Sequence, residues 1–193
     1  MPFIPQRLIG LYSASPGCGK STVARFLTAR GCERISFADP LRSMVFSLLI
    51  DLGYNSGQAH DWVHDQKERT IPQLGVSPRH LMRTLGTEWG RSCIHPSLWL
   101  LAWQARASGY NQVVVDDVRF PNEAELLRQR GGVLWRIERP GHQRPAEHSS
   151  DDALIDWTFD RVIVNDGTLA QLASDVEAAY SQWVDQNALL LAA

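Results

Sequence analysis

The stretch Ala14-Ser-Pro-Gly-Cys-Gly-Lys-Ser21 decides the fold expected for this chain of 193 residues. It matches the phosphate-binding pattern G-x-x-x-x-G-K-S/T, except that Ala14 stands at the first glycine position. That position lies where a strand leaves the sheet, and it needs a small residue more than a positive φ. Gly17 and Gly19 lie in the loop itself, where backbone N–H groups must converge on phosphate oxygens. The departure at Ala14 is therefore mild.

The residues on either side of this motif predict a strand, a glycine-rich turn and a helix. Arg7 to Ser13 is a short apolar run, and Ser21 to Arg30 carries apolar residues on one helical face. In this setting the motif predicts a P-loop that binds a nucleoside triphosphate. The alternative is a glycine-rich turn with a solvated lysine.

Each side chain of a P-loop has its own task. Lys20 would reach the β- and γ-phosphates, and Ser21 would bind Mg²⁺ through its hydroxyl group. Thr22 would meet the α-phosphate at the helix N-terminus. Cys18 is expected to contribute only its backbone N–H, because no resolving cysteine or catalytic histidine stands near it. The expected cofactors are ATP and Mg²⁺.

Strands and helices alternate along the rest of the chain, which predicts an α/β protein with a five-stranded parallel sheet in three layers. Besides the strand before the motif, strands are expected at 33–38, 112–116, 133–138 and 161–164. Further helices are expected at 39–52, within 58–68, from 77 onward, and at 98–107, 121–130 and 168–184. The run at 112–116 reads as a strand covered on both faces.

Composition and charge limit the classes of function. The formal net charge of −2 argues against a partner that is a nucleic-acid polymer. Of the 19 basic residues only Lys20 and Lys67 are lysines, and the other 17 are arginines. Three cysteines without C-x-x-C spacing favour a reducing cytoplasm. No targeting segment or bilayer-spanning run is recognisable, so a membrane partner is not expected.

Two carboxylates and an arginine follow the 112–116 strand. Ligands bind at the carboxyl ends of such strands, so we expect Asp116 or Asp117 to hold Mg²⁺ directly or through water. Asp116 is the predicted metal ligand and Asp117 the predicted catalytic carboxylate. Arg119 is well placed for an anionic substrate. The alternative is an aspartate that caps the next helix and pairs with Arg119.

Two longer segments carry a family resemblance. The segments 83–99 (RTLGTEWGRSCIHPSLW) and 116–123 (DDVRFPNE) strongly resemble bacteriophage-type deoxynucleoside monophosphate kinases, a branch of the P-loop NMP kinases. The segments 35–42 (ISFADPLR) and 164–168 (VNDGT) look like the same family, so the resemblance covers essentially the whole chain. It implies transfer of the ATP γ-phosphoryl group to a deoxynucleoside monophosphate (dNMP), which gives the diphosphate (dNDP) and ADP.

The resemblance also implies how a single P-loop NTPase domain of residues 1–193 is organised. Residues 1–38 and 111–193 would form the core, and residues 39–110 an inserted helical NMP-binding lobe. A lid is expected at about 139–151. The protein is expected in the cytoplasm, which would be the host cytoplasm if the protein comes from a phage. The sequence leaves open whether the protein forms a homodimer.

The acceptor is itself a phosphate, whose second pKa of about 6 makes it largely anionic at pH 7, so no strong general base is needed. Arginine forks suit phosphates better than lysine point charges do. We therefore assign Arg42 and Arg119 to the acceptor phosphate, with Arg83 as a third candidate. Asp39 would orient the sugar, the phosphate or Mg²⁺, or would only cap the helix that follows.

Thr87, Glu88 and Trp89 are the expected base-binding residues. Gly86 and Gly90 each weaken a helix by roughly 1 kcal/mol relative to Ala, which predicts close approach of a ligand or of backbone. Glu88 would accept a hydrogen bond from a base amino group, and Trp89 would stack on the base.

Trp89 also has a structural interpretation. It follows Leu81 and Leu85 at four-residue spacing, which favours a buried helical stripe. Core packing is the preferred interpretation of Trp89, with stacking second.

The lid region supplies further candidates for binding ATP. Arg139 and Arg144 would close on the triphosphate and exclude water, unless the segment is only a solvated loop. By resemblance, residues 165–168, which include Asn165 and Gly167, would flank the adenine, with backbone contacts preferred over side-chain contacts. His148 receives no role.

His60 and His64 stand four residues apart, like part of a zinc motif, but no third ligand is evident and a solvated helix face explains them. Residues 53–76 match no motif, which leaves the base preference open. Two rival functions remain: another small P-loop kinase such as dephospho-CoA kinase, or a module that binds ATP without catalysis. A module that only binds ATP would need no second anion site lined by arginines, so the sequence favours catalysis over such a module.

Overall fold

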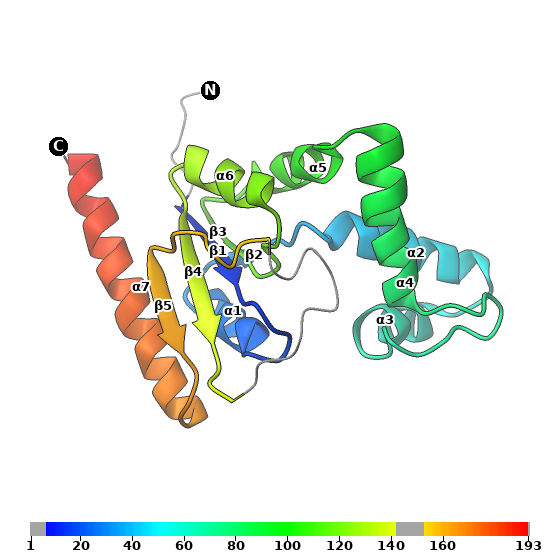
Figure 1. Cartoon of the computed structure of the whole chain (residues 1–193), viewed down its shortest axis with the longest axis horizontal. Helices are drawn as coiled ribbons and strands as arrows, with labels where there is room; N and C mark the ends of the chain where they lie inside the picture. Colours follow the sequence, from blue (N-terminus) through cyan, green and yellow to red (C-terminus); the bar gives the residue numbers. More distant parts are fainter. Residues whose placement is uncertain (1–6, 142–152, 193) are drawn as a thin grey trace. The chain divides into compact units, whose positions relative to one another are not determined.

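The computed structural model describes residues 7–141 and 153–192, with side chains as far as residue 186. The chain divides into two compact units (Figure 1). One, here called the core unit, comprises Met1–Ser36 and Ala107–Ala193. The other, the helical unit, comprises Phe37–Arg106. No helix in the described ranges is long and apolar enough to cross a bilayer.

The core unit contains a five-stranded sheet in the order β2-β3-β1-β4-β5, with every pair parallel. This arrangement confirms the predicted sheet. Strand β3 pairs with β1, so Asp116 follows a strand that neighbours the one leading into the P-loop. The strands are β1 (Arg7–Tyr12), β2 (Glu33–Arg34), β3 (Gln112–Val115), β4 (Val133–Glu138) and β5 (Arg161–Val164).

Helices cover both faces of this sheet (Figure 1). Ile9 and Leu11 of β1 pack in one cluster with residues of α1 (Lys20–Thr28) and α7 (Leu169–Ala192). Gly10 faces the other side, where a Cβ atom would lie 2.7 Å from Leu127 Cδ1 of α6 (Pro121–Gln129). Because side chains alternate along a strand, the sheet is the middle of three layers.

Two elements differ most in length from the sequence expectation. Strand β2 ends at Arg34 rather than at residue 38. It pairs only with β3, and after the Ile35 N–H donates to Val114 O at 3.1 Å the chain leaves the ladder. Helix α7 runs to Ala192 rather than to residue 184.

The helical unit is built from local helices around its own apolar core. Helix α3 begins with a capping box, in which Asn55 and Gln58 each bind the other's backbone N–H. The predicted cap Ser77 accepts from the N–H of His80 at 3.2 Å. The helices are α2 (Asp39–Asp51), α3 (Ser56–His64), α4 (Pro78–Thr84), η1 (Leu85–Ile94) and α5 (Leu98–Ala107).

Element η1 is a π-helix that continues α4 without a break. Its wider turn appears in the i→i+5 bond from His95 N–H to Gly90 O, at 2.9 Å. The indole N–H of Trp99 donates to Gly86 O at 2.7 Å, and a Cβ atom on Gly90 would lie 2.7 Å from Trp99 Cε2. The sequence predicted close approach of a ligand or of backbone, whereas the group that the structure places against the two glycines is the side chain of Trp99.

Candidate active site

The P-loop connects the carboxyl end of β1 to the first turn of α1. Gly17 has a φ of 79° and Gly19 a φ of 107°, the left-handed region that glycine enters without steric cost. Every described residue with a positive φ is a glycine, so Ala14 has an ordinary backbone conformation. The prediction that the first position needs no positive φ is confirmed.

Lys20 is the half-buried cation of the loop. Its Nζ donates to Ser13 Oγ, and Ser13 Oγ donates to Ser15 O at 2.8 Å. Burial lowers the pKa of Lys20 below its ordinary value, and the positive charge of Arg119 lowers it further. Nearby acidic groups raise that pKa in part: Cys18, Asp116 and Asp117. The structure therefore brings together Lys20, Arg119 and both aspartates.

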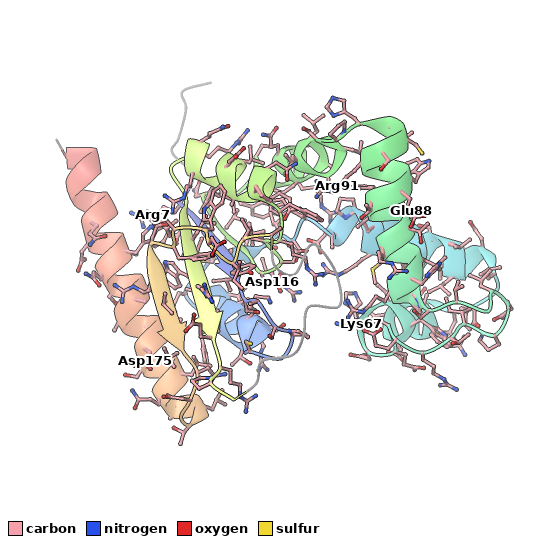
Figure 2. All side chains as sticks on the ribbon, viewed as in Figure 1. Arg7, Lys67, Glu88, Arg91, Asp116 and Asp175 are labelled. Carbon is pink, nitrogen blue, oxygen red and sulfur yellow. The ribbon has the colours of Figure 1, made fainter. Side chains whose placement is uncertain are left out.

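Asp116, labelled in Figure 2, is a buried carboxylate with two partners. It accepts from Ser36 Oγ at 2.6 Å and forms an ion pair with Arg34 at 2.9 Å. Sequence reasoning missed Ser36 and Arg34, because they lie some 80 residues away and only the pairing of β2 with β3 brings them near. Asp117 is half-buried and Arg119 is exposed.

Glu123 holds the backbone that carries Arg119. Its buried carboxylate accepts from the N–H of Arg119 at 2.8 Å and from the N–H of Phe120 at 3.1 Å. The N-cap of α6 is Phe120, so the alternative in which an aspartate caps this helix is wrong. A signal was available in the sequence, because a Glu three residues after an N-cap is typical of a capping box.

Two residues that follow β4 and β5 contact carbonyl groups of the P-loop. Asn165 Nδ2 donates to Cys18 O at 3.0 Å, and Arg139 Nη1 donates to Gly17 O at 3.4 Å. Gly167 lies beyond Asn165 on the way to α7. Ser21 is exposed in the first turn of α1, and Thr22 Oγ1 accepts from Arg25 at 3.5 Å. Two predicted lid residues, Arg144 and His148, lie outside the described residues.

The helical unit carries the other predicted phosphate ligands. Asp39 and Arg42 form an ion pair within the first turn of α2. The N-cap of α2 is Ala38, so the alternative in which Asp39 caps the helix is wrong. Arg83 is exposed, and its Nη2 lies 3.3 Å from His80 Nδ1.

Thr87, Glu88 and Trp89 are exposed on η1, and Figure 2 labels Glu88 there. The side chain of Trp89 is 42% exposed, so the preferred interpretation of Trp89 as a core residue is wrong. The α-helical stripe through Leu81 and Leu85 does not continue, because i→i+5 bonding changes the number of residues in each turn. The Trp89 ring lies 6.4 Å from the buried ring of Trp99.

The histidine pair on α3 has acidic neighbours. His60, Asp61 and Asp65 each place a ligand atom within 4.8 Å of the others, and His64 is not one of the three. All three residues are exposed, and the His60 ring lies 4.4 Å from the ring of His64.

Comparison with known proteins places this chain in a family. Residues 55–176 match the family model described as deoxynucleotide monophosphate kinase. A protein of Acanthamoeba polyphaga mimivirus, assigned as a deoxynucleotide monophosphate kinase, is 31% identical over 186 residues, with 88% of this chain and 93% of the relative covered. The deoxynucleoside-5′-monophosphate kinase of Escherichia phage T5 is 38% identical over 69 residues, covering 35% of this chain and 28% of the relative.

Solved structures of low sequence identity share the fold. Dephospho-CoA kinase from Campylobacter jejuni has a TM-score of 0.52 and 14% identity, with 92% of this chain and 97% of that chain covered. This likeness supports the α/β P-loop fold and leaves the substrate to other evidence. The family model matches more than half of the sequence and the mimivirus relative nearly all of it. The chain belongs to the deoxynucleotide monophosphate kinase family.

Proposed function

We propose that the protein transfers the γ-phosphoryl group of ATP to a deoxynucleoside 5′-monophosphate, which gives the deoxynucleoside diphosphate and ADP. One observation carries the proposal: β3 pairs with β1, so Asp116 and Asp117 follow the strand beside the one that leads into the P-loop, where Lys20 interacts electrostatically with both aspartates and with Arg119. Phosphoryl transfer requires cations for the transferred group and carboxylates for its metal ion in one place. The names of the relatives supply the acceptor.

The reaction itself needs little from acid–base chemistry. An oxygen of the acceptor phosphate attacks the γ-phosphorus, and the bond from that phosphorus to the β,γ-bridging oxygen breaks. ADP leaves with the electron pair. Because the attacking oxygen is already largely anionic at pH 7, the residues of the site align and neutralise charge.

The donor side of the reaction belongs to the core unit. Backbone N–H groups from Gly17 to Thr22 would surround the phosphates, and Lys20 would bind the β- and γ-phosphates. Arg139, which already contacts Gly17 O, would add a cation to the triphosphate site. Backbone groups of Asn165 and Gly167 would flank the adenine, and Arg144 remains a predicted lid ligand.

The residues of this site fit Mg²⁺. Mg²⁺ prefers oxygen ligands, and the site offers the carboxylates of Asp116 and Asp117 near Lys20, together with the hydroxyl of Ser21, the residue after Lys20 in the chain. Asp116 already accepts from Ser36 and Arg34, which orients its carboxylate. When bound, Mg²⁺ supplies positive charge to the β- and γ-phosphate oxygens.

The acceptor side would be served by Arg119 and by the helical unit. Arg42, held by its ion pair with Asp39, would bind the acceptor phosphate, and Arg83 would assist. Thr87, Glu88 and Trp89 would bind the base, which the exposure of all three side chains supports. The viral relatives support action in the cytoplasm of a host cell.

The test is an acceptor screen. The protein is incubated with ATP, Mg²⁺ and each of the four common dNMPs in turn, with dephospho-CoA as a separate acceptor, and products are separated by anion-exchange chromatography. We expect ADP and a dNDP in equal amounts for at least one deoxynucleotide. Phosphorylation of dephospho-CoA alone would favour the rival kinase. ATP binding without any phosphorylated acceptor would favour a binding module.

A further inference from the structure

Two carbonyl groups of the P-loop are held by side chains from distant parts of the core unit. Cys18 O accepts from Asn165 Nδ2 at 3.0 Å, and Gly17 O accepts from Arg139 Nη1 at 3.4 Å. Of the two contacts, the one from Asn165 is shorter, and its donor is half-buried whereas Arg139 is exposed. Asn165 therefore has the greater influence on the conformation of the loop.

Peptide geometry links these carbonyl contacts to phosphate binding. The described chain contains no cis peptide bond, and in a trans peptide the C=O and the following N–H point in opposite directions. When Asn165 holds Cys18 O on one side of the loop, the N–H of Gly19 points to the other side. An N–H that binds phosphate must be aimed before the ligand arrives if it is to bind without a cost of reorganisation.

Asn165 is itself fixed in place. Its backbone N–H donates to Glu138 O at 2.7 Å, which continues the pairing of β4 with β5. Its Nδ2 also occupies the space beside Gly19, where a Cβ atom would lie only 2.7 Å away. The position of Gly19 therefore has two reasons to be glycine: a φ of 107° and the presence of Asn165.

We propose that Asn165 is a positioning residue for the P-loop: its side-chain amide fixes the Cys18–Gly19 peptide so that the Gly19 N–H points at the phosphates of ATP. This role differs from a contact with adenine, which the family resemblance implied. It rests on the proposed use of ATP. The distinctive consequence is that the Asn165 side chain affects the binding affinity of any polyphosphate, whether or not the polyphosphate carries a base.

The first test compares ATP with inorganic tripolyphosphate, which has no base, by calorimetric titration in the presence of Mg²⁺. We expect Asn165→Ala to weaken both ligands by the same factor, about tenfold for one lost hydrogen bond. Asn165→Asp should weaken both further, because a carboxylate cannot donate to Cys18 O and repels the phosphates. The KM for the dNMP should stay unchanged. Asn111→Ala, at an exposed asparagine of the same unit, is the matched control.

Loss of ATP affinity with unchanged affinity for tripolyphosphate would overturn the proposal, because Asn165 would then act on the adenine. Unchanged affinity for both ligands would overturn it as well. A wild-type protein that binds neither ligand would contradict the proposed function instead.

A second measurement needs no ligand. In ¹⁵N spectra of the ligand-free protein, we expect Asn165→Ala to shift or broaden the Gly19 amide resonance, whereas Asn111→Ala leaves that resonance in place. A Gly19 resonance that is the same in Asn165→Ala and wild type would overturn the role of Asn165 independently of ATP binding.

Discussion

The candidate residues of the two units are held in different ways. In the core unit, Cys18 O is held by Asn165, 147 residues away, and the carboxylate of Asp116 by Ser36, 80 residues away. In the helical unit, the contacts of Arg42 with Asp39 and of Arg83 with His80 each span three residues of one helix.

The difference indicates where the protein is rigid before its substrates bind. Long-range contacts to a packed sheet restrict the P-loop, so its donors are aimed in advance. A contact within one helical turn orients two side chains relative to each other and adds little stability. We infer that triphosphate binding depends on preorganisation by the packed sheet, whereas acceptor binding depends on orientation within single helices.

The largest expected effect is that of Lys20→Ala. Removal of the P-loop cation should lower kcat by more than about 100-fold, as loss of one preorganised charge contact does, with the far-UV circular dichroism unchanged. The matched control is Lys67→Ala, because Lys67 is the other lysine of the chain and lies in the helical unit. Comparable kinase activity in the two variants would contradict the assignment of the P-loop as the donor site.

The next effect concerns the packing inside the helical unit. Gly90→Ala should destabilise the protein by about 1–3 kcal/mol, because the new methyl group meets the Trp99 ring. The free energy of unfolding is measured by denaturant titration. Gly109→Ala, where nothing lies within 4 Å of the added Cβ atom and φ is not positive, is the control. Equal stability of the two variants would argue against the tight contact at η1.

A smaller effect is expected at the acceptor phosphate. Arg42→Lys keeps the positive charge but loses the bidentate hydrogen bonding of the guanidinium group. The KM for the dNMP should therefore rise by about tenfold, while the KM for ATP stays the same. Arg106→Lys, at an exposed arginine of the same unit, is the control. A rise in the KM for ATP alone would move Arg42 to the donor side.

The smallest effect is a change in titration. With two lysines in the chain, ¹³Cε labelling gives two signals, which Lys67→Arg assigns. In the wild type Lys20 should titrate below its ordinary range, because burial and Arg119 both disfavour the charged form. Arg119→Met removes one of these two causes and should raise the pKa of Lys20. An unchanged pKa would show that the two side chains are not neighbours.

The P-loop and most of the elements could be predicted from the sequence because their signals are local. Strands β4 and β5 have the bounds expected from their apolar runs, and the loop glycines have the φ values that the motif requires. The short β2 and the exposed Trp89 could not be predicted. Both depend on which element lies next to the segment, and spacing along the chain does not contain that information.

By itself, the sequence determined the phosphate loop, its cation Lys20 and the alternation that builds a parallel sheet. Residues within a few positions of each other suffice for these features. Only the tertiary structure decided that Asn165 holds the P-loop, that Ser36 and Arg34 hold Asp116, and that Trp99 rests on the glycines of η1. These partners meet because strands and helices pack, and packing joins residues whose separation in sequence carries no signal of contact.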